Sequence, residues 1–163
     1  GLKVTFLPGD MESVRLPGEQ DLVASNAVLQ WAADPGALLA RMIAALKPGG
    51  VLGLATFGPS NLKEVRRLTG LSLPYFSLDA LREALSGRGA VIEHREEVRT
   101  LSFDSAHELL RHLKQTGVNG LQAQSWSVGR VREFCRDYET QFGVEGKVYL
   151  TYHPLLIVAR RRG

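Results

Sequence analysis

The chain contains a single cysteine, Cys135, among its 163 residues. One thiol excludes an internal disulfide and a metal site built from several cysteines. Chains without disulfides are typical of reducing compartments, so we expect a cytoplasmic location. Cys135 itself lies in a predicted helix, where we expect a plain buried or half-buried thiol rather than a reactive one.

Long apolar runs are also absent, because none approaches the ~18 residues that a membrane-spanning helix needs. The composition, 44% hydrophobic and 23% charged, is that of an ordinary globular domain. The net charge of +3 comes from arginines that are spread along the chain without interleaved aromatic residues. We therefore expect no membrane and no nucleic-acid partner. The histidines show no spacing typical of metal ligands, so we expect no metal and take His94, His107 and His112 as solvated surface residues.

The remaining pattern predicts an α/β fold. Apolar segments at residues 3–7, 21–29 and 51–57 are typical of strands, the last two of strands buried on both faces. A helix is predicted from Asp34-Pro35, since Asp34 is a good N-cap and proline suits the first helical position. Strand, helix and strand in succession predict a parallel pair. Further helices are predicted at 60–69, 77–85, 105–114 and 129–142, and further strands at 90–101 and 148–159.

Three local patterns are candidates for function. Residues 9–12, Gly-Asp-Met-Glu, follow the first strand, and a carboxylate at that end of a parallel strand can accept a hydrogen bond from an adenine amino group. Residues 21–31 form a strand that runs into Ser25-Asn26 and then Gln30-Trp31. Residues 46–52 contain a Lys-Pro-Gly-Gly turn before a strand. Taken singly, Asp10 is as well explained by capping, and Trp31 by core packing.

In this order, the patterns resemble the second half of the cofactor domain of class I S-adenosylmethionine-dependent methyltransferases. The resemblance implies a partial Rossmann-like fold that retains strands 3-4-5-7-6 and lacks strands 1 and 2, with a late helical insertion. It implies S-adenosylmethionine as cofactor, with Asp10 and Met11 at the adenine and Asn26 beneath the methionine part. The Lys-Pro-Gly-Gly turn is structural in that family.

The motif Asn26-x-x-x-Gln30-Trp31 resembles one shared by trans-aconitate methyltransferases and the BioC family of biotin-pathway malonyl-acyl-carrier-protein O-methyltransferases. Residues 109–118 and 148–159 resemble an arginine-containing helix and a Thr-Tyr-His strand of the second family. This resemblance implies a malonyl-acyl-carrier protein as partner. An arginine can bind a carboxylate with two hydrogen bonds. The implied substrate-side residues are Arg111, Tyr152, His153, Gln30 and Trp31; a carboxylate needs no general base, so no catalytic residue is expected.

The sequence departs from that family because it has no strand that leads into a Gly-x-Gly loop, and no second strand that ends in an acid for the ribose. We therefore expect the chain to be the carboxy-terminal part of a longer protein, and by itself to bind S-adenosylmethionine weakly or not at all. We expect one domain, 1–163, made of a partial core at 1–101, a helical substrate-side insertion at 102–146 and a terminal antiparallel strand at 147–163. The exposed edge of strand 21–29 should pair with residues 3–7 or with a second copy of the chain. The alternatives are a methyltransferase for a small polycarboxylate such as trans-aconitate and a non-catalytic assembly module.

Overall fold

The computed structural model describes residues 4–70, 73–116 and 126–163. Contacts within the chain define two compact units, which are described separately. The first unit comprises Gly1–Phe57, Phe76–Glu96 and Leu155–Gly163, and the second comprises Gly58–Tyr75 and Glu97–Pro154. The prediction of a single domain with an inserted helical segment stays a prediction. No helix within the described ranges is long and apolar enough to cross a membrane.

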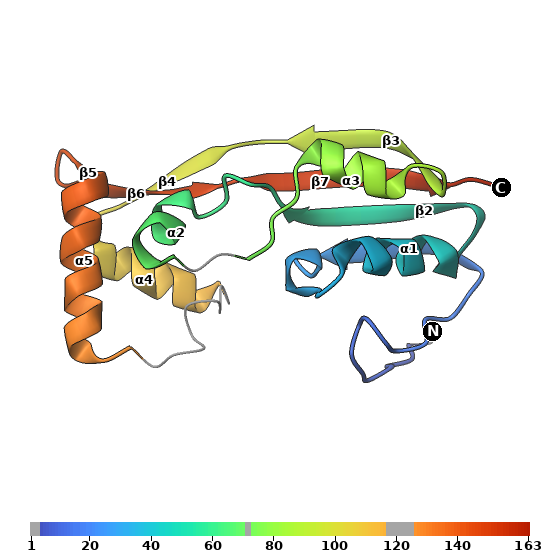
Figure 1. Cartoon of the computed structure of the whole chain (residues 1–163), viewed down its shortest axis with the longest axis horizontal. Helices are drawn as coiled ribbons and strands as arrows, with labels where there is room; N and C mark the ends of the chain where they lie inside the picture. Colours follow the sequence, from blue (N-terminus) through green and yellow to red (C-terminus); the bar gives the residue numbers. More distant parts are fainter. Residues whose placement is uncertain (1–3, 71–72, 117–125) are drawn as a thin grey trace. The chain divides into compact units, whose positions relative to one another are not determined.

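The first unit contains a four-stranded sheet in the order β1-β2-β7-β3, of which Figure 1 labels β2, β7 and β3. The strands β1 and β2 are parallel, and β3 runs antiparallel to β7. This confirms the predicted parallel pair and the predicted order of the last four strands. The strand bounds are Gln20–Asn26 for β1, Leu46–Phe57 for β2, Gly89–Glu96 for β3 and Pro154–Arg161 for β7.

Two α-helices and a short 3-10 helix complete the first unit: α1 (Pro35–Ala45), α3 (Leu78–Leu85) and η1 (Leu29–Trp31). The predicted capping of α1 is confirmed, because the Asp34 carboxylate accepts the Ala37 N–H at 2.9 Å. Ser77 caps α3 in the same way. Apolar faces of both helices form an almost wholly aliphatic core with the sheet, and each fully buried leucine contributes about 2 kcal/mol. Its members include Leu38, Leu39, Met42, Ile43, Leu52, Leu54, Leu81, Leu85 and Ile157.

The prediction of a strand at residues 3–7 is wrong for the part that the structure describes. Residues 4–7 have no strand conformation, and Phe6 is 87% exposed. An extended segment becomes a strand only where a neighbour supplies hydrogen bonds, and no described strand pairs with it. The strand β1 is therefore the edge of the sheet. Its residue Leu22 is 60% exposed, so the predicted burial on both faces is also wrong.

The second unit contains a three-stranded antiparallel sheet in the order β4-β6-β5, formed by Arg99–Phe103, Lys147–Tyr152 and Gly143–Val144. The helices of this unit are α2 (Lys63–Thr69), α4 (Ala106–Gln115) and α5 (Val128–Phe142). Ser105 and Ser127 cap α4 and α5 by accepting N–H groups of the first turn, each at 3.2 Å. All three helices were predicted, although α2 begins later than Ser60.

Two predicted strands are each divided between the sheets. The segment 90–101 becomes β3 and β4, and the segment 148–159 becomes β6 and β7, with His153 between them. Pro154 has no N–H to donate, so the ladder cannot run unbroken through it, as its predicted bulge position indicated. The Pro154 carbonyl instead accepts the Glu97 N–H at 3.2 Å, at the matching break between β3 and β4.

The core of the second unit is aromatic as well as aliphatic. Along α5, the ring of Phe134 contacts those of Trp126 and Tyr138, and Tyr138 contacts Phe142, with centroids 5.0 to 5.4 Å apart. Cys135 lies beside them, 4% exposed, which confirms the expected buried thiol. Burial and the nearby Glu139 raise the pKa of this thiol, which keeps it in the less reactive protonated form.

Candidate functional site

The first predicted site residues lie in a loop that is tied to α1 at both ends. The Asp10 carbonyl accepts the N–H groups of Ser13 and Val14, which closes a tight turn. The Glu12 carboxylate then accepts the Ala33 and Asp34 N–H groups, both at 2.9 Å. The Arg41 guanidinium donates to the Val14 carbonyl. Glu12 and Arg41 therefore fix this loop against the start and the middle of α1, a role that no local pattern in the sequence indicated.

This loop has groups that suit an adenine ring. One oxygen of the exposed Asp10 carboxylate accepts the Glu12 N–H at 2.9 Å, and no hydrogen bond from a described residue reaches the other. Met11 is half-buried against the aliphatic core of the first unit. A hydrogen-bond acceptor beside a thioether matches the exocyclic amino group and the apolar face of adenine. The described residues thus fit the adenine part of the predicted cofactor.

A second loop follows β1. Asn26 is the last residue of that strand, and it is exposed. Ala27 has a left-handed backbone with φ at 53°, which is uncommon for a residue other than glycine. The Gln30 amide donates to the Ala27 carbonyl at 2.9 Å and accepts the Thr56 hydroxyl at 3.3 Å. Because Gln30 is only 6% exposed, these partners favour a role in shaping the loop, and its predicted contact with the substrate stays a prediction.

The neighbours of this loop differ in how they face solvent. Trp31 is 44% exposed, so much of its ring is open to solvent and its predicted substrate contact stays a prediction. The Ser25 hydroxyl is buried and has no hydrogen-bond partner among the described residues. An unpaired buried hydroxyl is costly, so this oxygen marks the end of β1 as a place where a polar partner would be stabilising.

In the second unit, Arg111 and His112 lie side by side in sequence near the end of α4. Arg111 is exposed, and no described carboxylate pairs with its guanidinium. The His112 imidazole bonds the Tyr152 hydroxyl, with Nε2 2.9 Å from the oxygen, and the two rings meet edge to face. Burial raises the pKa of Tyr152. The expectation that His112 is a solvated surface histidine is therefore wrong, because β6 brings a tyrosine to its ring.

His153 is buried rather than open, with 6% of its surface exposed. Its Nδ1 accepts the Ser60 N–H at 3.1 Å, so the imidazole carries its proton on Nε2 when neutral. The His153 N–H donates to the Asn61 side chain, whose amide donates in turn to the Tyr75 hydroxyl. The ring also lies against Gly58, where a Cβ atom would come within 2.6 Å of it. The residues after β2 thus hold His153 in one orientation.

One buried carboxylate was not foreseen. Glu64 lies in the helix predicted at residues 60–69, and it is only 7% exposed. Its two oxygens accept the Thr151 N–H at 3.0 Å and the Thr151 hydroxyl at 2.5 Å. Glu64 therefore ties α2 to β6 just before Tyr152 and His153. The helical period placed Glu64 on α2, but no local pattern could show that a strand 87 residues later faces it.

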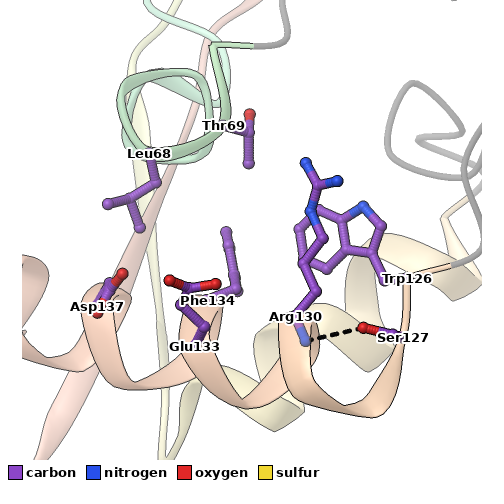
Figure 2. Close-up of a pocket in the computed structure, with 8 residues that line it drawn as sticks. All are labelled: Leu68, Thr69, Trp126, Ser127, Arg130, Glu133, Phe134 and Asp137. Atoms are coloured by element: carbon purple, nitrogen blue, oxygen red, sulfur yellow. Dashed lines mark hydrogen bonds between the residues drawn. The ribbon is translucent and has the colours of Figure 1, made fainter.

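A separate cleft of about 540 Å³ lies between α2 and α5. Figure 2 shows Leu68 and Thr69 of α2 on one side, and Arg130 and Phe134 of α5 on the other. Charges of both signs line it, from Arg130, Glu133 and Asp137. None of the predicted site residues lines this cleft. No group of three or more potential metal-binding side chains occurs in the part of the chain that the structure describes.

Sequence comparison identifies relatives of known name. A family model described as a methyltransferase domain matches residues 1–54. Proteins named malonyl-[acyl-carrier protein] O-methyltransferase match nearly the whole chain. The one from Chlorobium phaeovibrioides is 41% identical over 97% of this chain and 61% of its own length. That from Bacteroides thetaiotaomicron is 39% identical over 98% and 65%, and that from Bacteroides helcogenes is 39% identical over 99% and 60%. The chain thus spans less than two thirds of the length of these relatives.

Solved structures show the fold. A candidate methyltransferase from Bacillus halodurans superimposes with a TM-score of 0.69 at 14% identity, covering 98% of this chain and 78% of that one. The YcgJ protein of Bacillus subtilis superimposes with a TM-score of 0.59 at 16% identity, covering 95% and 70%. The described residues therefore have the class I methyltransferase fold, as their strand order indicated. In sequence, the chain is similar over nearly its whole length to proteins named malonyl-[acyl-carrier protein] O-methyltransferase.

Proposed function

We propose that this chain is part of an S-adenosylmethionine-dependent O-methyltransferase that methylates the free carboxylate of a malonyl-acyl-carrier protein. One observation carries the proposal: identity to relatives of that name extends through 97 to 99% of the chain and so includes both units. A likeness confined to residues 1–54 would support a methyltransferase without indicating its acceptor. The second unit is where acceptor specificity is expected, because it contains Arg111, Tyr152 and His153.

The proposed reaction needs alignment rather than proton transfer. When bound, the cofactor would supply a methyl group from a positively charged sulfur to a carboxylate oxygen, and the electron pair of the broken carbon–sulfur bond would stay on sulfur, so that both charges would be neutralised. A carboxylate is ionised at neutral pH, so no general base is required. What the protein must provide is orientation and the exclusion of water.

On the cofactor side, the roles follow from the two loops of the first unit. Asp10 would accept a hydrogen bond from the adenine amino group, Met11 would pack against the ring, and Asn26 would lie beneath the methionine part. Glu12 and Arg41 support this assignment because they hold the first loop in one conformation. Since no strand of this sequence leads into a Gly-x-Gly loop, the chain by itself should bind the cofactor weakly.

On the acceptor side, Arg111 would read the malonyl carboxylate. Its exposed guanidinium, with no described carboxylate paired to it, supports this role. His112 follows Arg111 in sequence and is hydrogen-bonded to the Tyr152 hydroxyl. These two side chains offer further polar atoms for the same ligand. A positive group distinguishes malonyl from neutral acyl groups, and it should orient the carboxylate without neutralising the nucleophile.

The test is a methylation assay on a longer protein that contains this chain and a Gly-x-Gly segment. We expect methyl transfer to malonyl-acyl-carrier protein and none to trans-aconitate. Transfer to trans-aconitate alone would replace the acceptor, and transfer to neither would favour a non-catalytic assembly module. Calorimetry on the isolated chain tests the cofactor side. A dissociation constant in the low micromolar range for S-adenosylmethionine would contradict the expected weak binding.

A further inference from the structure

The first unit buries very few polar side chains, and those it buries meet at one loop. Among its described residues, the polar side chains below 9% exposure are Gln30 at 6% and Thr56 at 5%. They are hydrogen-bonded to each other, and Gln30 also donates to the Ala27 carbonyl. Buried amides are usually retained for a specific partner, because an unpaired one is costly. The partner here is the backbone of the loop that follows β1.

That backbone is held in a conformation that alanine rarely adopts. Ala27 has a φ of 53°, where its Cβ atom crowds the backbone. Its N–H donates to the Ala55 carbonyl of β2 at 2.9 Å, and its own carbonyl accepts from Gln30 at 2.9 Å. The peptide groups on both sides of Ala27 are therefore fixed. Strained residues persist only where such contacts over-determine them, and they concentrate at functional sites.

The orientation of these peptides decides what the end of β1 presents. The described chain has no cis peptide bond, so the Asn26 carbonyl points opposite to the Ala27 N–H. That N–H points to β2, and the Asn26 carbonyl must then point away from β2, toward the outer edge of β1. A carbonyl oxygen there is an acceptor of the kind that the ammonium group of a methionine moiety requires.

We propose that Gln30 and Thr56 are positioning residues, which hold the Asn26–Ala27 loop in its cofactor-receptive conformation without touching the cofactor or the acceptor. Thr56 orients the Gln30 amide, and Gln30 stabilises the left-handed turn at Ala27. We call the hydrogen-bonded pair of Gln30 and Thr56 the brace. Its effect on the loop is a property of the chain alone, whereas the identity of the ligand rests on the proposed function. Under this proposal, Gln30 would not make the substrate contact first predicted for it.

The brace is tested without any ligand by amide hydrogen exchange on the isolated chain. Gln30→Leu removes the amide at similar volume, and we expect exchange at the Ala27 N–H to become about tenfold faster, while the amides of β2 change little. Thr56→Val, a milder change, should have the same local effect to a smaller degree. Ser77→Ala, which removes the cap of α3 in the same unit, is the matched control and should leave Ala27 unaffected. Unchanged exchange at Ala27 in both brace variants would overturn the proposal.

Coupling gives a second criterion that a merely structural role would not meet. Glycine adopts a positive φ readily, so Ala27→Gly should relieve the need for the brace. We expect Gln30→Leu to change exchange at residue 27 less in the Ala27→Gly background than in the wild-type chain. If the effects of the two substitutions simply add, Gln30 does not act through Ala27.

The ligand side uses the longer protein and S-adenosylhomocysteine, the demethylated cofactor, in a calorimetric titration. Gln30→Leu should weaken binding about tenfold, and Thr56→Val less, while Ser77→Ala leaves it unchanged. The turnover number at saturating cofactor should change little, because neither residue touches the reacting atoms. If exchange responds as expected but affinity does not, the brace exists without serving the cofactor and the positioning role fails. If the wild-type protein binds no S-adenosylhomocysteine, the proposed function fails instead.

Discussion

The two units place their buried polar side chains differently. In the first unit, Gln30 and Thr56 act on the backbone of one loop, and the rest of the core is aliphatic. In the second unit, the buried polar residues fix side chains and a strand end around the β6–β7 junction: Asn61, Glu64, Thr151 and His153. The first arrangement suits a ligand held by main-chain groups and strand ends. The second suits recognition by side chains from several segments.

The largest effect should come from the buried carboxylate of the second unit. Glu64→Ala leaves the Thr151 N–H and hydroxyl without their charged acceptor, and we expect a loss of about 3 kcal/mol in the free energy of unfolding. Urea denaturation measures it. Glu64→Gln keeps an oxygen acceptor and should cost less. The exposed Glu93 of β3 provides the control, since Glu93→Ala should stay within about 0.5 kcal/mol of wild type. If Glu64→Ala lowers the free energy of unfolding no more than the control does, Glu64 does not stabilise the contact between α2 and β6.

Replacing Arg111 should impair the function of the second unit without changing its stability. In the longer protein, Arg111→Ala should lower kcat/KM for the malonyl acceptor about 30-fold, or about 2 kcal/mol. The affinity for S-adenosylhomocysteine and the unfolding free energy should not change, because the side chain is exposed. Arg132→Ala, an exposed arginine on α5, is the matched control and should have little effect. Equal losses in the two variants would assign the effect to general charge.

High pH should act on the second unit, because it contains all four tyrosines of the chain. Burial is the main cause that raises the pKa values of Tyr75, Tyr138 and Tyr152. A raised pKa favours the protonated phenol in the folded state. The stability it contributes is complete below the unfolded pKa of about 10 and is lost as the pH rises above it.

The variant that tests this is Tyr138→Phe, because the Tyr138 hydroxyl donates to the Tyr149 carbonyl at 2.7 Å. It should cost about 1 kcal/mol at neutral pH and reduce the loss of stability between about pH 9 and 11. Denaturation at several pH values gives both quantities. If the free energy of unfolding falls as steeply with rising pH in Tyr138→Phe as in the wild type, Tyr138 is not the group responsible.

The smallest effects come from helix caps, one in each unit. Ser77→Ala in the first unit and Ser105→Ala in the second should each cost about 1 kcal/mol, since each hydroxyl accepts one N–H of its helix. The two cap variants test whether the units open independently. If they do, each variant should speed up amide hydrogen exchange more in its own unit than in the other unit. Equal responses throughout would show one cooperative transition.

Local chemistry made much of the first unit predictable. Asp34 and Pro35 marked α1, Ser77 marked α3, and the strand–helix–strand order gave the parallel pair. The same reasoning misjudged β1, because an apolar run indicates burial but not whether a neighbour covers both sides. The same reasoning also predicted β6 and β7 as one strand, because apolar residues lie on both sides of His153 and Pro154. The two strands are separated only by the break in their pairing.

The site was less predictable than the fold. Asn26 lies at the end of β1 as predicted, whereas Asp10 and Met11 follow a segment that is no strand in the described residues. The roles of all three residues stay predictions. Glu12 and Glu64 were missed because their partners are backbone groups remote in sequence, at Ala33 and at Thr151. Gln30 was noticed for its motif, but only the geometry at Ala27 indicates what it holds. Local patterns cannot identify carboxylates whose partners lie on other elements.

The two tryptophans of the chain are divided between the units, and this has an optical consequence. Trp31 is 44% exposed in the first unit, whereas Trp126 stacks near Phe134 in the second. Their emission should therefore differ in wavelength, with that of Trp31 shifted to the red by water. Replacing either one with phenylalanine leaves a fluorophore that reports on a single unit. The chain thus contains one intrinsic fluorescent probe for each unit.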